Sequence, residues 1–585
     1  MTSRAVVVCA AVAVVAVAAC ARTRTIVGTV DDGGVGEAGA GTGGASGGFA
    51  TGGAGGGVGG QGGGGAGGSV PAAPLRPPEW NCGPTCFRDP SIAATPSPAG
   101  SFGGPADNNP VNKPAFAYPL AGSMHPINLP DITFHWRRGM GASQTLFRIR
   151  ATATTAGSPT YDFYVRCKTP PGTDTPPAQE ECVYDLPPGA WLALASQNKG
   201  GEVSFTVAGT GDQGGPVATS DARTLWFSPD GVKGGLYYWS VGLRGTYRLL
   251  FGASKATPFI RPESPSNPTK CAGCHVVSRD GNVIAFSAGD DADKAHLMVV
   301  PTANPEMPRF VPATTHDSAI IALNPDGSRA LVSYASRLEL RDTRDGSVMG
   351  TVAPGFLGAE MQGYHPEWSP DGKEIVLTLS NMRDAEWAVK TGQIAVIPFN
   401  NGAFGPAQIV APSGADFHYY PSWSPDGKWI AFASAPAGAG KLSYNQADSR
   451  LRLVSRSGGT IYDLVNATQG VGRTSTWPKF APYMQAGGNI MFITFNSKID
   501  YGFILKDNIT HPDGGEPQLW MAALDLRKLS AGDKDPSLAP LWLPFQNVKQ
   551  RNHLGYWTQE VGCRMNSDCG ESENCEAGYC IRVVQ

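Results

Sequence analysis

Four copies of one short unit, spaced at nearly equal intervals, constrain the fold of this chain more than any other feature. Each copy carries an Asp-Gly pair followed by β-forming residues, and the pairs begin at positions 280, 326, 371 and 426. The intervals between the copies are therefore 46, 45 and 55 residues. A repeat of about 45 residues built from short strands is typical of β-propeller blades. The pattern predicts an all-β fold in which similar sheets are arranged in a ring.

The copies themselves are "SRDGNVIAFS" (278–287), "NPDGSRALVS" (324–333), "SPDGKEIVLT" (369–378) and "SPDGKWIAFA" (424–433). Asp-Gly favours a tight hairpin turn, because Gly accepts a positive φ. Trp368 and Trp423 stand just before the turn, and we expect them to pack between blades. A weaker copy spans 477–495, and one further blade fits between 505 and 560. The count is six blades, with seven as the alternative.

The motif Trp-Ser-Pro-Asp-Gly-Lys resembles the repeats of the TolB-like (WD40-like) propeller family. The resemblance covers residues 259–560 and implies a six-bladed propeller with a central channel. It implies little about chemistry, since one fold serves many functions.

Residues 115–258 have a different pattern, with short alternating strands separated by Gly, Pro and Ser turns. This spacing predicts a β-sandwich. The segment "GLYYWSVGLR" (235–244) resembles a late strand of a fibronectin type III domain, which implies a sandwich of that kind. An unrelated sandwich or an additional blade are the alternatives. The "FSPDG" at 227–231 is expected to be a turn and not part of a blade.

The N-terminus has the pattern of an export signal. Arg4 precedes an apolar stretch at 5–19, which is too short to span a membrane. Val17-Ala18-Ala19-Cys20 resembles a bacterial lipobox, which implies that residues 1–20 form a lipoprotein signal peptide and that Cys20 is lipidated. An ordinary signal peptide cut nearby is the alternative. No Asp follows Cys20, so the resemblance favours an outer membrane lipoprotein of the bacterial cell envelope, facing the periplasm or the surface.

Residues 21–114 are expected to be a flexible linker. Between positions 33 and 68, 22 of 36 residues are Gly, and a Pro-rich stretch follows. Such a composition cannot form a packed core. The lipid on Cys20 would be the only membrane attachment, and a net charge of −3 gives no electrostatic reason to expect nucleic acid as a partner.

Export places the cysteines in an oxidising compartment, where disulfides are expected. Eight of the twelve Cys fall into local sets that can pair among themselves: Cys82, Cys86, Cys167, Cys182, Cys563, Cys569, Cys575 and Cys580. The last four lie in a polar tail, 561–585, whose connectivity the sequence leaves open. Cys271 and Cys274 remain for another use, although they could also pair with each other.

Cys271-Ala272-Gly273-Cys274-His275 matches the C-x-x-C-H pattern of covalent haem attachment. One short turn would present both thiols to the haem edge, and His275 would be the proximal iron ligand. A C-x-x-C-H followed by a Ser-x-Asp-Gly hairpin resembles TolB-like propeller proteins with a cytochrome c motif in the first blade. The resemblance implies that Cys271, Cys274 and His275 carry haem c.

Five of the nine histidines fall where blades are expected to begin: His275, His316, His365, His418 and His553. Together they predict an imidazole-lined channel mouth that faces the haem. Our candidates for the sixth iron ligand are, in order, His553, Met361 and His365. A His/Met pair would raise the redox potential, and a five-coordinate iron is the alternative.

Three functions are compatible with this sequence. The first is an exported, lipid-anchored c-type haem protein that transfers electrons to a redox partner or other envelope protein and is not an enzyme. The second is a TolB-like scaffold that binds a protein or glycan, with Cys271 and Cys274 joined as a structural disulfide. The third is a haem enzyme of the peroxidase type. We favour the first, because the C-x-x-C-H pattern is specific.

Overall fold

The structure is a computed structural model that describes residues 79–559, 573–576 and 579–582, apart from short internal stretches. The stretches left out are 95–96, 141–143, 155–156, 172–179, 254, 265–271, 290–295, 303–304, 306–308, 311–319, 335–336, 386, 471–472, 511–514. The expected signal peptide with Cys20 and the Gly-rich part of the expected linker therefore lie outside the described residues, as do Cys271, His316, Cys563 and Cys569.

Two β-sheets form a sandwich in the N-terminal part of the described chain. The larger sheet has the order β1 (Cys86–Arg88), β6 (Thr160–Val165), β5 (Leu146–Ala153), β8 (Glu202–Thr210), β10 (Arg223–Phe227) and β3 (Met124–His125), with β9 (Ala218–Thr219) beside β8. The smaller sheet consists of β2 (Ala115–Tyr118), β4 (Thr133–Arg137) and β7 (Glu181–Asp185). Phe134 and Trp136 from the small sheet pack with Phe147 and Phe205 from the large one, and α2 (Pro188–Gln197) adds Trp191 to this core. The predicted sandwich is present.

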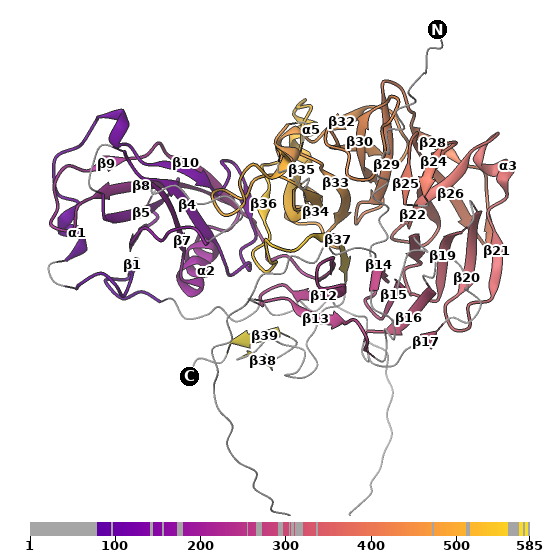
Figure 1. Cartoon of the computed structure of the whole chain (residues 1–585), viewed down its shortest axis with the longest axis horizontal. Helices are drawn as coiled ribbons and strands as arrows, with labels where there is room; N and C mark the ends of the chain where they lie inside the picture. Colours follow the sequence, from indigo (N-terminus) through magenta and orange to yellow (C-terminus); the bar gives the residue numbers. More distant parts are fainter. Residues whose placement is uncertain are drawn as a thin grey trace, which may run out of the picture. The chain divides into compact units, whose positions relative to one another are not determined.

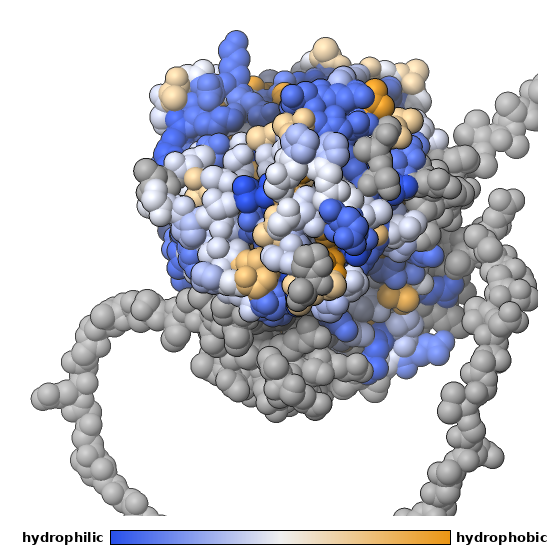
Figure 2. Space-filling model, turned by 90° about the vertical axis from the view of Figure 1, so that its left-hand side faces the viewer, coloured by the Kyte–Doolittle hydropathy of each residue, from blue (hydrophilic) through white to orange (hydrophobic). Residues whose placement is uncertain are grey.

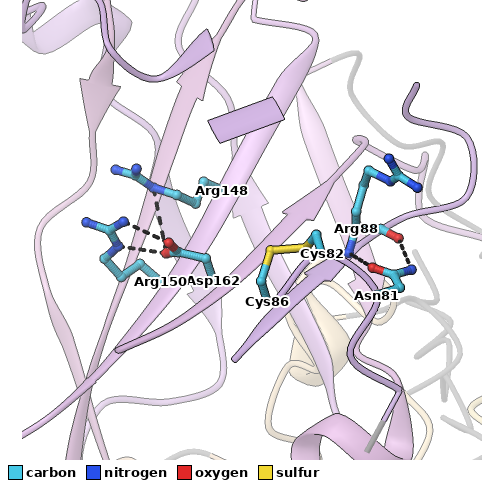
Figure 3. The surroundings of a disulfide bond; sticks show 7 residues. All are labelled: Asn81, Cys82, Cys86, Arg88, Arg148, Arg150 and Asp162. Atoms are coloured by element: carbon cyan, nitrogen blue, oxygen red, sulfur yellow. Dashed lines mark hydrogen bonds and ion pairs between the residues drawn. A yellow bond between two sulfur atoms is a disulfide. The ribbon is translucent and has the colours of Figure 1, made fainter. Parts of the chain in front are cut away.

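The end of the expected linker is folded, so the linker boundary at 114 is wrong. Strand β1 pairs in parallel with β6, and α1 (Pro98–Ser101) and η1 (Pro110–Asn112) follow it. A disulfide joins Cys82 to Cys86 ahead of β6 (Figure 3), and a second disulfide joins Cys167 to Cys182. Figure 3 also shows the side chain of Asn81, which accepts a hydrogen bond from the backbone N–H of Arg88 and donates one to the carbonyl oxygen of the same residue. Backbone pairing and a crosslink order a segment whose composition alone predicts a coil.

Six antiparallel sheets follow one another as the blades of a propeller (Figure 1). Blade 1 contains β37 (Asn552–Thr558), β11 (Gly235–Ser240), β12 (Gly245–Leu250) and β13 (Thr257–Ile260); blade 2 contains β14 (Ala272–Val277), β15 (Val283–Ala288), β16 (His296–Pro301) and β17 (Arg309–Phe310); blade 3 contains β18 (Ile320–Leu323), β19 (Arg329–Tyr334), β20 (Arg337–Asp342) and β21 (Val348–Thr351). Blade 4 contains β22 (Gln362–Trp368), β23 (Glu374–Ser380), β26 (Gln393–Asn400), β27 (Ala403–Phe404) and β28 (Gln408–Ala411); blade 5 contains β29 (Asp416–Trp423), β30 (Trp429–Pro436), β31 (Arg450–Ser455) and β32 (Ile461–Asp463); blade 6 contains β33 (Thr476–Phe480), β34 (Ile490–Ser497), β35 (Gln518–Asp525) and β36 (Leu541–Trp542).

Smaller elements connect these sheets. They are the hairpin of β24 (Arg383–Ala385) and β25 (Ala388–Val389), the helices α3 (Pro354–Leu357), α4 (Val465–Thr468) and α5 (Leu526–Ser530), the 3-10 turns η3 (Ala486–Gly488) and η4 (Asn508–Thr510), and the tail hairpin of β38 (Glu573–Glu576) and β39 (Tyr579–Arg582). In that hairpin Cys575 and Cys580 are backbone partners.

Blade 1 is made from two distant parts of the chain, which corrects two expected boundaries. Strand β11 pairs antiparallel with β37, from Gly235 opposite Thr558 to Ser240 opposite Asn552. Residues 235–260 therefore belong to the propeller, so the sandwich does not extend to 258, and the segment that carried the fibronectin resemblance is a blade. The interval 505–560 is not a separate blade either, because β35 and β36 complete blade 6. The C-terminal strand β37 thus becomes the innermost strand of the first blade, which joins the two ends of the propeller in one sheet.

The expected turns and inter-blade tryptophans are confirmed. Gly281, Gly327, Gly372 and Gly427 have φ values of 78°, 71°, 71° and 70°. Trp423 packs with residues of blades 4 and 5, and Trp368 packs with residues of blades 3 and 4. The repeat therefore predicts both the hairpin and the contact that joins neighbouring blades.

The surface drawn in Figure 2 is mostly hydrophilic or intermediate in hydropathy, and its apolar residues are scattered. Among the described residues, none of the helices has the length and hydropathy needed to cross a membrane.

Candidate functional site in the propeller channel

The innermost strands share one irregularity that determines which side chains enter the channel. In β14, β22, β29, β33 and β37 the pairing with the next strand shifts at the same place, which is a β-bulge. One residue in each bulge has a positive φ: Cys274 (49°), His365 (51°), Tyr420 (52°), Trp477 (52°) and Leu554 (55°). We call these five residues the bulge ring.

Three side chains of the bulge ring pack against one another. The rings of Tyr420 and Trp477 stack with centroids 3.5 Å apart. His365 lies 4.2 Å from Tyr420 and 6.1 Å from Trp477, measured between ring centroids. Four of the five residues are buried, and Cys274 is partly buried. This level of the channel is packed with aromatic side chains.

Cys274 carries a free thiol in this packed environment. Burial raises the pKa of the thiol to about 12. The pKa of Tyr444 is also raised to about 12, first by burial and in smaller part by the charge of Cys274, so the two groups lie near each other. At neutral pH the thiol stays protonated, whereas metal binding and nucleophilic attack both need the thiolate.

His275 is the residue after the bulge, and its side chain contacts residues of blade 1. Its Nε2 donates to the carbonyl oxygen of Tyr237 at 3.1 Å, and its ring contacts the edge of Tyr556 at 5.5 Å. The side chain is 1% exposed, and burial lowers its pKa to about 4. In the other bulges the same position holds Pro366, Pro421, Pro478 or Gly555.

The described residues of the C-x-x-C-H motif do not fit a haem in this arrangement. Attachment needs a turn that presents both thiols to one edge of the porphyrin, but Ala272 and Gly273 are extended and pair with Ala288 and Ser287. The Nε2 of His275 donates its proton to a carbonyl oxygen and is not available to iron, whereas Nδ1 is buried without a hydrogen-bond partner among the described residues. Cys274 is a free thiol, and the alternative of a Cys271–Cys274 disulfide involves Cys271, which lies outside the described residues.

The candidates for the sixth ligand are not brought together. Met361 packs into the core between blades 3 and 4, outside the channel. His553 lies 6.0 Å from the ring of Trp239, whereas His365 bonds Thr378 Oγ1 through Nδ1 at 3.2 Å. His418 bonds Ser434 Oγ at 3.0 Å. The expected imidazole-lined mouth is therefore not formed by His275, His365, His418 and His553, because they occupy four different positions relative to the bulges.

A second ring of side chains lies two residues after the bulge ring, since alternate residues of a strand face the same side. It holds Val276, Glu367, Ser422, Lys479 and Tyr556. Glu367 accepts hydrogen bonds from Ser422 Oγ at 2.9 Å, from the backbone N of Trp423 at 2.8 Å and from Lys479 Nζ. The ammonium of Lys479 also lies 4.6 Å from the ring centre of Tyr556.

A cavity of about 80 Å³ adjoins this second ring on the side of the Asp-Gly turns. Glu367, Lys479, Ser422 and Arg279 form its polar wall. Its apolar wall comes from blades 2, 3 and 4 and from blade 1: Val276, Ile321, Ala322, Leu323, Trp368 and Trp557. Ligand sites usually combine an apolar wall with a few convergent polar groups, but they measure about 300–1,000 Å³, so this cavity accommodates a small molecule or only the end of a larger one. This cavity is the candidate site.

Sequence reasoning missed Glu367, Lys479 and Arg279, although a signal was present. Aligning "CHVVSRDG" with "HPEWSPDG" and "YPSWSPDG" places Cys274 at the position of His365 and Tyr420. The same alignment shows a charged residue, Glu367, where a channel-facing position is expected. The histidines, in contrast, occupy a different position relative to the bulge in each blade, so their presence near blade entries does not predict a common site.

In the part of the chain that the structure describes, there is no cluster of three or more His, Cys, Asp or Glu side chains that could hold a metal ion. The sequence matches no family model and no curated protein.

Several solved structures are similar to this chain. TolB from Acinetobacter baumannii is 13% identical over 61% of this chain and 79% of its own, with a TM-score of 0.36. A putative TolB from Agrobacterium tumefaciens is 18% identical over 53% of this chain and 90% of its own, with a TM-score of 0.31. The dihydro-heme d1 dehydrogenase NirN is 14% identical over 53% of each chain, with a TM-score of 0.30. With TM-scores this low, the propeller assignment rests on the six sheets themselves.

Proposed function

We propose that this protein is an exported binding propeller whose ligand enters the cavity beside Glu367, Lys479 and Arg279. The observation that carries the proposal is the buried Glu367–Lys479 pair in the cavity wall. A buried ion pair contributes little net stability compared with apolar residues of similar size. Its presence in the wall of a cavity supports a role in recognition.

Several features support placing this function outside the cytoplasm. The disulfides Cys82–Cys86 and Cys167–Cys182 favour an oxidising compartment. Together with the lipobox-like Cys20, they support a lipid-anchored protein of the bacterial outer membrane, tethered by its Gly-rich segment. The partner would be a small molecule or an exposed end of another envelope protein. The N-terminal β-sandwich would act as a spacer.

The proposal can be tested with hydrogen exchange on the full chain, using hexanoate, hexylamine, hexanol and N-acetylglucosamine as probes at millimolar concentration. We expect at least one probe to slow exchange in β22 and β33, which carry Glu367 and Lys479. The same probe should have no effect on the sandwich strand β5. If none of the four probes changes exchange in β22 or β33, the proposal is wrong.

Covalent haem remains a second candidate, favoured by the C-x-x-C-H pattern and by the free thiol of Cys274. It requires β14 to adopt a different conformation, and it would make the protein an electron carrier. A pyridine haemochrome spectrum of protein made together with a cytochrome c maturation system tests it. A haemochrome that is lost in the Cys271→Ala, Cys274→Ala double variant would favour this candidate, and no haemochrome in the native chain would exclude it.

A further inference from the structure

Arg279 departs from the repeat at the position that faces the cavity. The corresponding residues in the other three copies are Pro325, Pro370 and Pro425. Proline has no polar side-chain group and adds only apolar surface to the turn. In the first copy the chain instead places a guanidinium in the wall of the cavity.

The side chain of Arg279 crosses the channel mouth. It starts in the turn of blade 2, and its Nη2 donates to the carbonyl oxygen of Pro425 at 3.2 Å, in the turn of blade 5. In a ring of six blades, blades 2 and 5 lie opposite each other. This bond uses one N–H, whereas a guanidinium carries five in a rigid fork. Arg279 is thus held over the cavity with hydrogen-bonding capacity to spare.

The charges around the cavity leave a net positive centre. Lys479 and Glu367 neutralise each other through their ion pair. The aspartates of the four turns are engaged locally: Asp280 accepts from Ser278, Asp326 from Ser328, Asp371 from Ser369 and Asp426 from Ser424. Among the described residues, these aspartates are not part of the cavity wall. The charged side chains of the wall itself are Arg279, Lys479 and Glu367, two positive and one negative, which leaves one net positive charge beside the cavity.

We propose that this cavity recognises a carboxylate on a short apolar body, with Arg279 binding the carboxylate. An Arg fork matches the two oxygens of a carboxylate, which makes this contact both strong and directional. The apolar wall of Ile321, Leu323 and Trp368 would bury the body of the ligand. A free organic acid and the C-terminal residue of a peptide share this chemistry. The inference rests on the proposed function and specifies its ligand.

The test compares hexanoate with hexanamide and hexanol by saturation-transfer NMR on the full chain. An acetylated dipeptide ending in Leu, with a free or an amidated C-terminus, separates the peptide source from the free acid. Arg279→Pro is the key variant, because it restores the turn sequence found in the other copies and should keep the fold. Arg279→Lys keeps the positive charge but lacks the planar guanidinium that can donate two parallel hydrogen bonds to a carboxylate. Equal urea midpoints and circular dichroism spectra would establish that the variants are folded.

We expect hexanoate to bind at least about tenfold more tightly than hexanamide, since a charge-assisted hydrogen bond contributes this much or more. Arg279→Pro should remove that preference, and Arg279→Lys should retain part of it. If hexanol or hexanamide binds as tightly as hexanoate, the carboxylate inference is wrong while the binding function stands. If hexanoate affinity is unchanged in Arg279→Pro, Arg279 does not bind the carboxylate. If no probe binds, both proposals fail.

Discussion

Replacing Lys479 with Met tests the energetics of the candidate site most directly. The change removes the ammonium but keeps an unbranched apolar side chain of similar length. Glu367 then loses its cation and keeps the hydrogen bonds from Ser422 Oγ and Trp423 N. Breaking a buried ion pair by removing one partner costs about 3–5 kcal/mol. Because the Glu367 side chain is 21% exposed and keeps two donors, we expect a loss of about 2–3 kcal/mol.

The measurement is urea unfolding followed by tryptophan fluorescence for Lys479→Met, Glu367→Gln and the double variant. The double variant should be more stable than the sum of the single losses predicts, by about 2 kcal/mol, since it leaves no unpaired charge. Lys373→Met is a matched control, because the Lys373–Asp371 pair is 3.9 Å long and the lysine side chain is 71% exposed. We expect that control to change stability by less than about 0.5 kcal/mol.

The pH dependence provides a separate check. Burial is the largest single influence on the pKa of Lys479 and would lower it, but the charges and hydrogen bonds of Glu367 and Tyr556 together outweigh burial, so the pKa is raised. Because the pKa of Lys479 is higher in the folded than in the unfolded chain, its protonation stabilises the fold. This stabilisation is complete at pH values below the ordinary lysine pKa of about 10.4, and it is lost as the pH rises through the pKa of the folded state. The difference between native chain and Lys479→Met should therefore be constant between about pH 6 and 9 and shrink above about pH 10.5. The reasoning would be refuted if the native chain and Lys479→Met had equal urea midpoints at neutral pH. It would also be refuted if the difference in stability between them increased as the pH rises.

Three further predictions concern the channel. In a Cys271→Ala background, Cys274 should resist labelling by a thiol reagent up to about pH 9 and react once the chain is unfolded, because burial raises its pKa to about 12; rapid native-state labelling would contradict this. His365→Gln should reduce the loss of stability between about pH 6.5 and 4, because burial lowers the pKa of His365 to about 3 and the unfolded chain binds the extra proton; an unchanged pH profile of the urea midpoint would count against it. Trp423→Ala should cost about 3–5 kcal/mol by leaving a cavity between blades 4 and 5, and a loss below 1 kcal/mol in the same assay would show that the inter-blade contact is not needed.

Local features of the propeller were predictable from sequence because they depend on neighbouring residues. The Asp-Gly pairs predict their turns since only glycine adopts the positive φ without strain, and Trp368 and Trp423 mark the inter-blade core by their place in the repeat. The bounds of blade 1 were not predictable, because β11 and β37 lie more than 300 residues apart and β11 is a short buried strand that would suit a sandwich equally well.

The candidate site, too, was predictable only in its local sequence pattern and not in the contacts that the fold makes. The C-x-x-C-H pattern is visible in sequence, but the bulge at Cys274 and the hydrogen bond of His275 to Tyr237 of blade 1 are decided by the fold. Glu367 and Lys479 lie on different blades, and only the ring brings them into contact.

The amino-acid order alone determined the repeat, its hairpins and the all-β class, since those follow from local backbone preferences and a short periodicity. The tertiary structure decided which strand closes the ring, which residues meet in the channel and where a cavity remains. Those outcomes depend on contacts between distant segments, and a one-residue bulge is enough to exchange the side chains that face the channel for those that face the core.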